Sequence, residues 1–368
     1  MFSIARRARP RITVVAAARP NFMKVGPVIR ALQPGADVEL VHTGQHYDAG
    51  MSATFFDELG LPEPGNNLGV GSGTHAETTA AVMIAFERYL QANTRDAVVV
   101  VGDVNSTVAA AMAAVKLRIP VAHVEAGLRS RDWDMPEEIN RVLTDRVSRW
   151  LFTTSKDAND NLRAEGAPEP WIHLAGNVMI DTLLANLERA LEHGEAARTR
   201  LGLQGTYGLM TLHRPSNVDE ARVFQRLLTA VEHVSAQVPI LFPAHPRTMQ
   251  QLRQLGIDLP GGLRMIDPIG YLDFVGLMAG SAVVLTDSGG IQEETSVLGI
   301  PCLTLRENTE RPITCELGTN RLVGTDPDAI ARGAENALTT GGEPAHIPFW
   351  DGRAGERVAA VLLRDLVG

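Results

Sequence analysis

The sequence predicts two α/β domains in tandem, each built around a doubly wound parallel sheet. Strand-like and helix-like segments alternate over almost all of the 368 residues. The strand-like segments are short and continuously apolar, as expected for strands covered by helices on both faces. The alternation restarts at residue 207, and a chain of this length is long for one domain but comfortable for two.

In the first half, the apolar runs bounded by turn residues predict strands at 11–17, 38–44, 96–103, 120–127, 150–155 and 171–177. Apolar residues at helical spacing predict helices at 22–33, 51–60, 75–93, 106–118 and 137–149. The ten or so residues before the first strand are expected to form a loose leader. They are not read as a secretion signal, because the apolar run ITVVAAA has only seven residues.

In the second half, the same reasoning predicts strands at 207–213, 239–246, 263–267, 282–288, 301–306 and 320–326, with helices between them. Polar residues at the carboxyl ends of these strands are the candidates for function, because ligands bind there in open α/β sheets. Two such domains that face one another are expected to form a cleft.

Composition excludes several classes of protein. The formal net charge of −9 makes nucleic acid an unlikely main partner. No apolar run approaches the length needed to span a membrane. Cys302 and Cys315 are the only cysteines and have no metal-ligand spacing around them, so no metal site is expected. This cysteine usage suits a reducing cytoplasm.

Three acidic residues of the first half lie where strands end or a helix begins. Asp103 ends VVVVGD, Glu125 ends VAHVEAG, and Glu137 follows Pro136 at the start of a helix. Asp103 could cap the next helix, and acids are common in a first helical turn. Glu125 has no evident helix to cap. Three carboxylates near one cleft would raise one another's pKa values and so supply acids and bases that work near neutral pH.

The stretch TDSGGIQEET, residues 286–295, predicts a strand, a glycine turn and the start of a helix. Gly289 and Gly290 would let a ligand approach the backbone, and the free amides at the helix start would attract an anion. The alternative is an ordinary turn with Ser288 as a helix cap. Glu294, one turn further on, could accept hydrogen bonds from both hydroxyls of a ribose.

Basic residues lie at the same strand ends. A diphosphate is bound by cations and backbone amides together, and five side chains could supply the cations: Arg19, Lys24, His213, Arg214 and Arg311. Taken singly, each is better explained as a solvated loop charge. Phe274 could stack beside a base or belong to the core.

Seven motifs in order resemble those of the UDP-N-acetylglucosamine 2-epimerases of the non-hydrolysing kind: ARPNFMKVGP, VVGDVNST, HVEAGLRS, MPEEINR, TLHRPSNVD, TDSGGIQEE and ENTERP. The resemblance implies a GT-B fold of two Rossmann-like domains that close on a UDP-sugar. It implies that the last helix crosses back to the first domain. The expected domains are then 1–175 with 355–368, and 176–354.

The resemblance also implies roles for individual residues. The acids Asp103, Glu125 and Glu137 and the imidazole of His213 would be catalytic. The substrate-binding residues would be Arg19, Lys24, Arg214, Ile269, Phe274, Ser288, Gly289, Gly290, Glu294 and Arg311, with the backbone of Ile269 reading the uracil. No cofactor is implied, and the family suggests a cytoplasmic homodimer that serves cell-surface polysaccharide synthesis.

The expected reaction inverts carbon 2 of UDP-N-acetylglucosamine by elimination of UDP to a glycal and re-addition. A hydrolysing epimerase and a GT-B glycosyltransferase are the alternatives. A nucleotide-sugar sensor would have no use for three acids, and a nicotinamide enzyme would need a GxGxxG where this chain has AAARPNF. Residues 45–48 read QHYD and residues 71–77 read GSGTHAE, which departs from family members whose substrate is also an activator.

Overall fold

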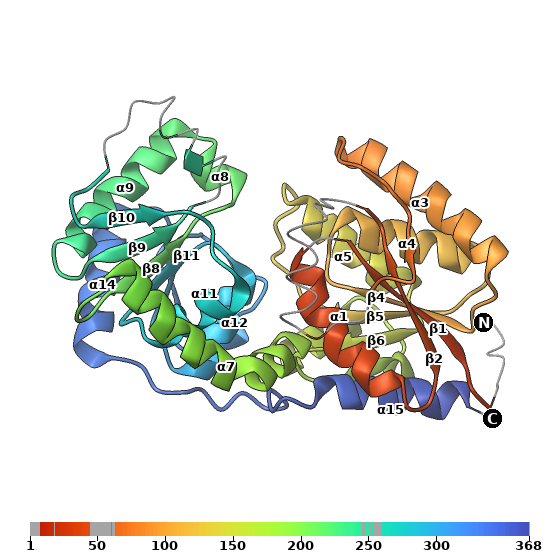
Figure 1. Cartoon of the computed structure of the whole chain (residues 1–368). Coiled ribbons are helices and arrows are strands. Elements are labelled where there is room, and N and C mark those ends of the chain that lie inside the picture. The colour runs from red at the N-terminus through yellow and green to blue at the C-terminus, as the bar shows by residue number, and fades with distance from the viewer. Residues whose placement is uncertain are drawn as a thin grey trace. The chain divides into compact units, whose positions relative to one another are not determined.

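The computed structural model describes residues 8–17, 19–44, 60, 63–244, 248–249, 252 and 259–367. The chain divides into two compact units, Met1–Leu184 with Pro348–Gly368, and Ala185–Ile347 (Figure 1). Over the described ranges, no helix is long and apolar enough to cross a membrane.

The first unit is built on a parallel sheet of seven described strands in the order β3-β2-β1-β4-β5-β6-β7. The strands are β1 (Arg11–Ala16), β2 (Asp37–His42), β3 (Asn66–Asn67), β4 (Ala97–Val101), β5 (Val121–Ala126), β6 (Trp150–Thr153) and β7 (Ile172–Leu174). Every residue of β4 and β5 is buried, as the continuously apolar runs predicted. The short polar strand β3 has no apolar run and was not predicted.

Helices cover both faces of this sheet. They are α1 (Arg19–Leu32), α3 (His75–Ala92), α4 (Asn105–Lys116), α5 (Pro136–Val147), α6 (Lys156–Ala164), the short 3₁₀ helix η1 (Glu169–Trp171) and α15 (Ala354–Leu366). In Figure 1, α1 and α15 lie together on one face, and α3, α4 and α5 lie on the other. The helix expected at 51–60 lies outside the described residues, apart from Gly60.

The second unit has a parallel sheet of six described strands in the order β10-β9-β8-β11-β12-β13. They are β8 (Gly208–Thr211), β9 (Ile240–Pro243), β10 (Leu263–Ile266), β11 (Val284–Thr286), β12 (Cys302–Thr304) and β13 (Asn320–Leu322). The helices are α8 (Pro215–Val218), α9 (Ala221–Ser235), α11 (Tyr271–Ala279), α12 (Gly289–Leu298), α13 (Ile313–Glu316) and α14 (Pro327–Thr340). A core of buried Leu, Val, Ile and Phe side chains joins this sheet to α9 and α14.

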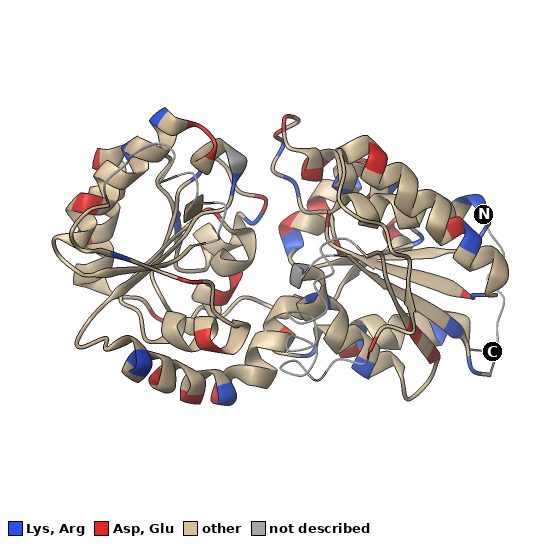
Figure 2. Ribbon diagram, turned by 45° about the horizontal axis from the view of Figure 1, so that its top comes forward, with Lys and Arg blue, Asp and Glu red and all other residues tan. Residues whose placement is uncertain are grey.

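Charged residues of both signs are interspersed along the exposed helices of the two units (Figure 2). The long helix α7 (Val178–Leu201) is an example, with Arg198 contacting Glu195 on an exposed turn. This mixture is typical of a solvated helix face.

The first unit includes the beginning of α7, beyond the bound expected at residue 175. Thr182 Oγ1 donates a hydrogen bond to the carbonyl oxygen of Met23 in α1. The carboxylate of Asp181 accepts hydrogen bonds from the backbone N–H groups of Ala354 at 3.0 Å and Gly355 at 2.7 Å. Asp181 therefore caps the N-terminus of α15 and ties the last helix of the chain to α7.

We predict that Asp181→Ala lowers the free energy of unfolding of the first unit by about 1–3 kcal/mol, because two buried amides lose a charged acceptor. Urea unfolding followed by circular dichroism measures the change. Asp160→Ala is the matched control, since Asp160 is exposed and pairs with Arg163 on the surface of α6. Equal midpoints for the two variants would contradict the capping role.

Candidate active site

The carboxyl end of β5 holds the first candidate acid in an unusual conformation. Glu125 is 3% exposed and has φ 71°, in the left-handed region that favours glycine. The pairing of β5 with β6 shifts register between Val124 and Ala126, so Glu125 is the extra residue of a bulge. Backbone strain of this kind costs about 1–3 kcal/mol and is often found at functional sites.

The bulge directs the Glu125 side chain toward the neighbouring strand end. Its Oε2 forms an ion pair with Nζ of Lys24, which is buried in α1. A Cβ added to Gly102, just beyond β4, would lie 3.3 Å from the same Oε2. Glu125 therefore lies over the turn that carries Asp103, with the ammonium group of Lys24 beside it.

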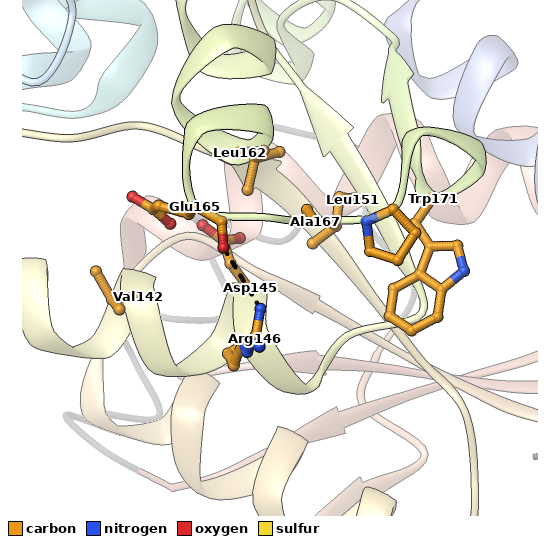
Figure 3. A pocket seen from close by; sticks show the side chains of 9 residues that line it. Val142, Asp145, Arg146, Leu151, Leu162, Glu165, Ala167 and Trp171 are labelled. Atoms are coloured by element: carbon orange, nitrogen blue, oxygen red, sulfur yellow. Dashed lines mark hydrogen bonds between the residues drawn. The ribbon is translucent and has the colours of Figure 1, made fainter. Parts of the chain in front are cut away.

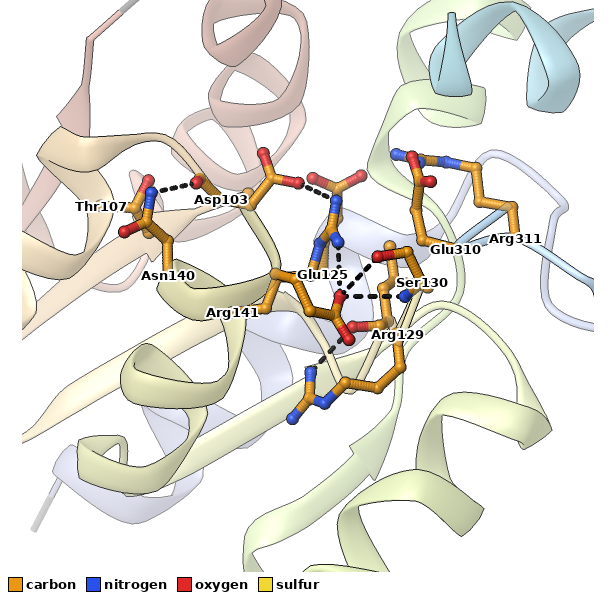
Figure 4. Close-up of polar contacts among 12 residues, drawn as sticks. Asp103, Thr107, Glu125, Arg129, Ser130, Asn140, Arg141, Glu310 and Arg311 are labelled. Atoms are coloured by element: carbon orange, nitrogen blue, oxygen red, sulfur yellow. Dashed lines mark hydrogen bonds and ion pairs between the residues drawn. The ribbon is translucent and has the colours of Figure 1, made fainter. Parts of the chain in front are cut away.

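Asp103 is held by the helix α5. Arg141 forms an ion pair with Asp103 Oδ2, and Asn140 donates a hydrogen bond of 2.9 Å to the carbonyl oxygen of Asp103 (Figure 4). The Asp103 side chain keeps 25% of its surface exposed, whereas that of Arg141 is 2% exposed. The Asp103 carboxylate is thus held by a buried arginine on one side and is accessible to solvent on the other.

Two neighbouring acids of α5 have different environments. Glu138 is buried and accepts hydrogen bonds from the backbone N–H groups of Ser130 and Arg131, and it also pairs with Arg141. Glu137 is half-buried in the first turn. Glu137 and Arg141 are four residues apart, so they share a face of α5. This is the face that reaches Asp103.

In the second unit, the glycine turn accommodates an arginine. A Cβ added to Gly289 would lie 2.3 Å from Nη1 of Arg311 and 2.7 Å from Oε1 of Glu310. Gly289 is the first residue of α12 and its φ is not positive, so backbone conformation does not call for glycine at this position. The close approach of the Arg311 and Glu310 side chains does. Ser288 is the N-cap residue of α12 by position, but within the described residues its side chain makes no capping hydrogen bond.

Arg311 is itself buried between carboxylates. Its Nε donates to Glu293 Oε1 at 2.7 Å, and its Nη1 pairs with Glu310. Glu310 also binds Arg306 at 2.8 Å. Arg311 therefore sits at the start of α12, in a fixed orientation, next to the first amides of that helix and Gly290.

Asp287 organises the loop after β8. The backbone N–H groups of His213 and Arg214 and the Asn217 side chain donate to its carboxylate at 3.0–3.1 Å. The His213 ring lies 2.7 Å from the same carboxylate and is 57% exposed. Burial alone would raise the pKa of Asp287, but these hydrogen bonds and the His213 charge hold it below its usual range.

Glu294 is buried in α12 and accepts a hydrogen bond of 2.9 Å from the hydroxyl of Tyr271 in α11. Burial raises the pKa of Glu294 to about 7, an effect that the Tyr271 hydrogen bond opposes and the charge of Glu293 increases. Phe274 lies one turn after Tyr271 and is half-buried, as is Ile269 just before the helix. Of these residues, Tyr271 and Glu294 are in direct contact.

Two parts of the predicted site, the Arg19 side chain and residues 45–48, lie outside the residues that the structure describes. The backbone of Arg19 begins α1.

The family model of UDP-N-acetylglucosamine 2-epimerase matches residues 30–363 of this chain. The chain belongs to the UDP-N-acetylglucosamine 2-epimerase family. It is 42% identical to the UDP-N-acetylglucosamine 2-epimerase of Methanocaldococcus jannaschii, with 96% of this chain and 98% of that protein aligned. It is 39% identical to the UDP-2,3-diacetamido-2,3-dideoxy-D-glucuronate 2-epimerase of Pseudomonas aeruginosa, over 96% and 99% of the two chains.

Solved structures of the family have the same fold. The crystal structure of the M. jannaschii UDP-GlcNAc 2-epimerase in complex with UDP-GlcNAc and UDP matches with a TM-score of 0.90 at 41% identity, covering 96% of this chain and 99% of that one. The GT-B-like fold predicted from the sequence is therefore confirmed, as is the resemblance to the family. The chain is an epimerase that acts on a nucleotide sugar.

Sequence reasoning missed the partners that hold these side chains. Arg141, Asp287 and Tyr271 each contact a predicted site residue directly. Arg141 and Asp287 belong to the motifs MPEEINR and TDSGGIQEE, but neither was given a role; Tyr271 belongs to none of the seven motifs. Arg141 belongs to a buried face of α5 that is polar throughout, whereas the apolar residues Ile139 and Leu143 are exposed, so the apolar pattern did not indicate which face of this helix is buried. Tyr271 is the first residue of α11.

We predict that Gly289→Ala lowers the free energy of unfolding of the second unit by about 1–3 kcal/mol, because the new methyl group must displace the buried Arg311 guanidinium. Gly261→Ala is the matched control, since a Cβ at Gly261 meets no described atom within 4 Å. Thermal unfolding of both variants measures the difference. A Gly289→Ala protein as stable as the control would show that Arg311 does not need this space.

Proposed function

We propose that the chain interconverts UDP-N-acetylglucosamine and UDP-N-acetylmannosamine, by elimination of UDP to a glycal and re-addition of UDP. The observation that carries the proposal is the left-handed, buried Glu125 beside the turn that bears Asp103. A fold that only bound the nucleotide would have no need to hold a strained carboxylate at this point.

The second unit would hold the UDP group. Arg311 and the first amides of α12 would bind the diphosphate, since a helix N-terminus and a guanidinium both favour an anion. Glu294 would accept from the ribose hydroxyls, with Phe274 and Ile269 beside the base. His213, held by Asp287, would contact the phosphates or the sugar. These donors would stabilise the charge that develops on departing UDP.

The carboxylates of the first unit would move the protons. One of them removes the proton from carbon 2 while the bond between carbon 1 and oxygen breaks, which gives the glycal and UDP. UDP then adds back to carbon 1 while a proton reaches carbon 2 from the opposite face. Two faces require at least two proton carriers. Asp103, Glu125 and Glu137 would supply them, and Lys24 and Arg141 would hold two of the three in place.

Two variations of this proposal remain to be separated by experiment. The P. aeruginosa relative acts on a diacetamido-glucuronate, which favours that sugar as a second candidate substrate. A hydrolysing enzyme would use the same residues and admit water to the intermediate. The family resemblance extends the proposal to a cytoplasmic homodimer that serves cell-surface polysaccharide synthesis.

The reaction is tested in deuterated water with UDP-N-acetylglucosamine, followed by NMR. We expect deuterium at carbon 2 of both epimers, including substrate recovered before equilibrium, because the proton leaves and returns from solvent. Free UDP is expected to accumulate only slowly. A hydrolysing enzyme would release one UDP and one labelled N-acetylmannosamine per turnover, and a glycosyltransferase would leave carbon 2 unlabelled. Epimerised product with protium at carbon 2 would exclude the elimination route.

Asp103→Asn, Glu125→Gln and Glu137→Gln each remove a proton carrier and nearly keep the side-chain shape. We predict that each lowers kcat by about 10²–10⁴. Calorimetry should find the affinity for UDP largely unchanged, because the proposed UDP contacts lie in the second unit. Turnover close to that of the wild type in any one variant removes that residue from the catalytic set.

The affinity for UDP is predicted to rise with pH through about 7. Glu294 has its pKa raised to about 7, so it is protonated below that pH and ionised above it. Ribose hydroxyls donate best to the ionised form. One pH unit below the pKa only about a tenth of the carboxyl groups are ionised, which weakens binding by up to about tenfold. In Glu294→Gln the rise of UDP affinity near pH 7 should disappear, whereas a rise caused by titration of UDP itself would remain. A rise that persists in this variant would show that a group other than Glu294 is responsible.

A further inference from the structure

A buried histidine connects the two turns that carry Asp103 and Glu125. His123 lies in β5, two residues before Glu125, and is 0% exposed. Its Nε2 lies 2.9 Å from the carbonyl oxygen of Gly102, the residue before Asp103. Its Nδ1 lies 2.6 Å from Oδ1 of Asp145 in α5. Both partners are acceptors, so both ring nitrogens donate when both hydrogen bonds are made.

Asp145 extends this connection to the other side of the bulge. Its Oδ2 accepts from the backbone N–H of Gly127 at 3.0 Å and from Nη2 of Arg129 at 2.7 Å. Gly127 follows the bulge directly and has φ 80°. Asp145 thus holds the chain after Glu125, while His123 holds the turn before Asp103.

The charges of this cluster balance, with three of the four groups buried and the side chain of Glu165 41% exposed. Arg129 also forms hydrogen bonds to the Glu165 carboxylate at 2.7–2.8 Å. A doubly protonated His123 with Arg129 therefore faces the carboxylates of Asp145 and Glu165, two charges of each sign. Burial alone would raise the pKa of the Asp145 carboxyl, but His123 and Arg129 outweigh it and hold the pKa below its usual range.

The outer side of the cluster is mostly apolar. Asp145 and Glu165 line a pocket of about 230 Å³ whose other walls include Leu151, Leu162 and Trp171 (Figure 3). Asp145 forms its hydrogen bonds with His123, Gly127 and Arg129 on the side of the bulge. A buried polar cluster is costly unless every member is satisfied, and an apolar residue in β5 would be cheaper for folding alone.

We propose that His123, Asp145 and Arg129 are positioning residues that set the separation of the Asp103 and Glu125 carboxylates during epimerisation. The inference rests on the proposed function, because it assumes that these two acids exchange protons with carbon 2. The cluster acts through the backbone: His123 fixes Gly102 relative to β5, and Asp145 fixes Gly127 relative to α5.

Two substitutions separate the two hydrogen bonds of His123. His123→Gln keeps a donor near the Nε2 position, toward Gly102, and His123→Asn keeps one near the Nδ1 position, toward Asp145. Asp145→Asn keeps the shape but presents an amide to three donors. We expect each to lower kcat about 10–100-fold, as a misplacement near 1 Å does, with unchanged affinity for UDP.

The decisive measurement is the ratio of deuterium in recovered substrate to deuterium in product, taken early in deuterated water. Loss of folded protein lowers both labels equally and leaves the ratio at the wild-type value. A shift of one carboxylate relative to the other changes delivery to the two faces unequally, so the ratio should change. His173→Gln is the control, since His173 is a half-buried strand histidine in β7 whose ring lies tilted against the ring of Phe152.

The outcomes separate this inference from the proposed function. A wild-type protein that incorporates no deuterium overturns both. Wild-type labelling, together with variants that keep the wild-type ratio, overturns the positioning role alone, whatever their kcat. A changed ratio in the His123 and Asp145 variants, with the wild-type ratio in His173→Gln, supports it.

Discussion

The register slip in β5 is the constraint on which the acidic site of the first unit depends. A regular strand would direct residue 125 along the face of the sheet, among the apolar side chains that the helices cover. The extra residue between Val124 and Ala126 turns the Glu125 side chain toward the end of β4 instead. Lys24 then has a buried partner, and a Cβ at Gly102, whose φ of 69° favours glycine, would lie 3.3 Å from the same carboxylate.

In each unit, the candidate site side chains are held by partners from elements distant in the sequence. In the first, α1 supplies Lys24 to Glu125, and α5 supplies Arg141 to Asp103. In the second, the end of β11 supplies Asp287 to His213, and α11 supplies Tyr271 to Glu294. The two sheets are therefore platforms on which polar partners from neighbouring elements meet at the carboxyl ends of the strands.

The sequence predicted every described strand except β3, the parallel arrangement of the strands and the polar residues at their ends, because each follows from local patterns of apolar and turn residues. It did not predict that Arg141 reaches Asp103, because α5 buries a polar face and exposes Ile139 and Leu143, the reverse of the apolar pattern from which the helix was predicted. It explained Gly289 by exposed amides, whereas the close approach of Arg311 requires that glycine. The left-handed backbone of Glu125 was equally invisible, because no residue type marks it.

The conformation of Glu125 has a consequence for engineering. Glycine adopts a φ near 71° without strain, and replacement of both partners of a buried ion pair by apolar groups is often neutral or stabilising. A library selected only for heat resistance would therefore favour loss of Glu125 together with Lys24, which removes the candidate proton carrier while leaving the second unit intact. Heat-resistant members of such a library should be assayed for turnover before they are ranked.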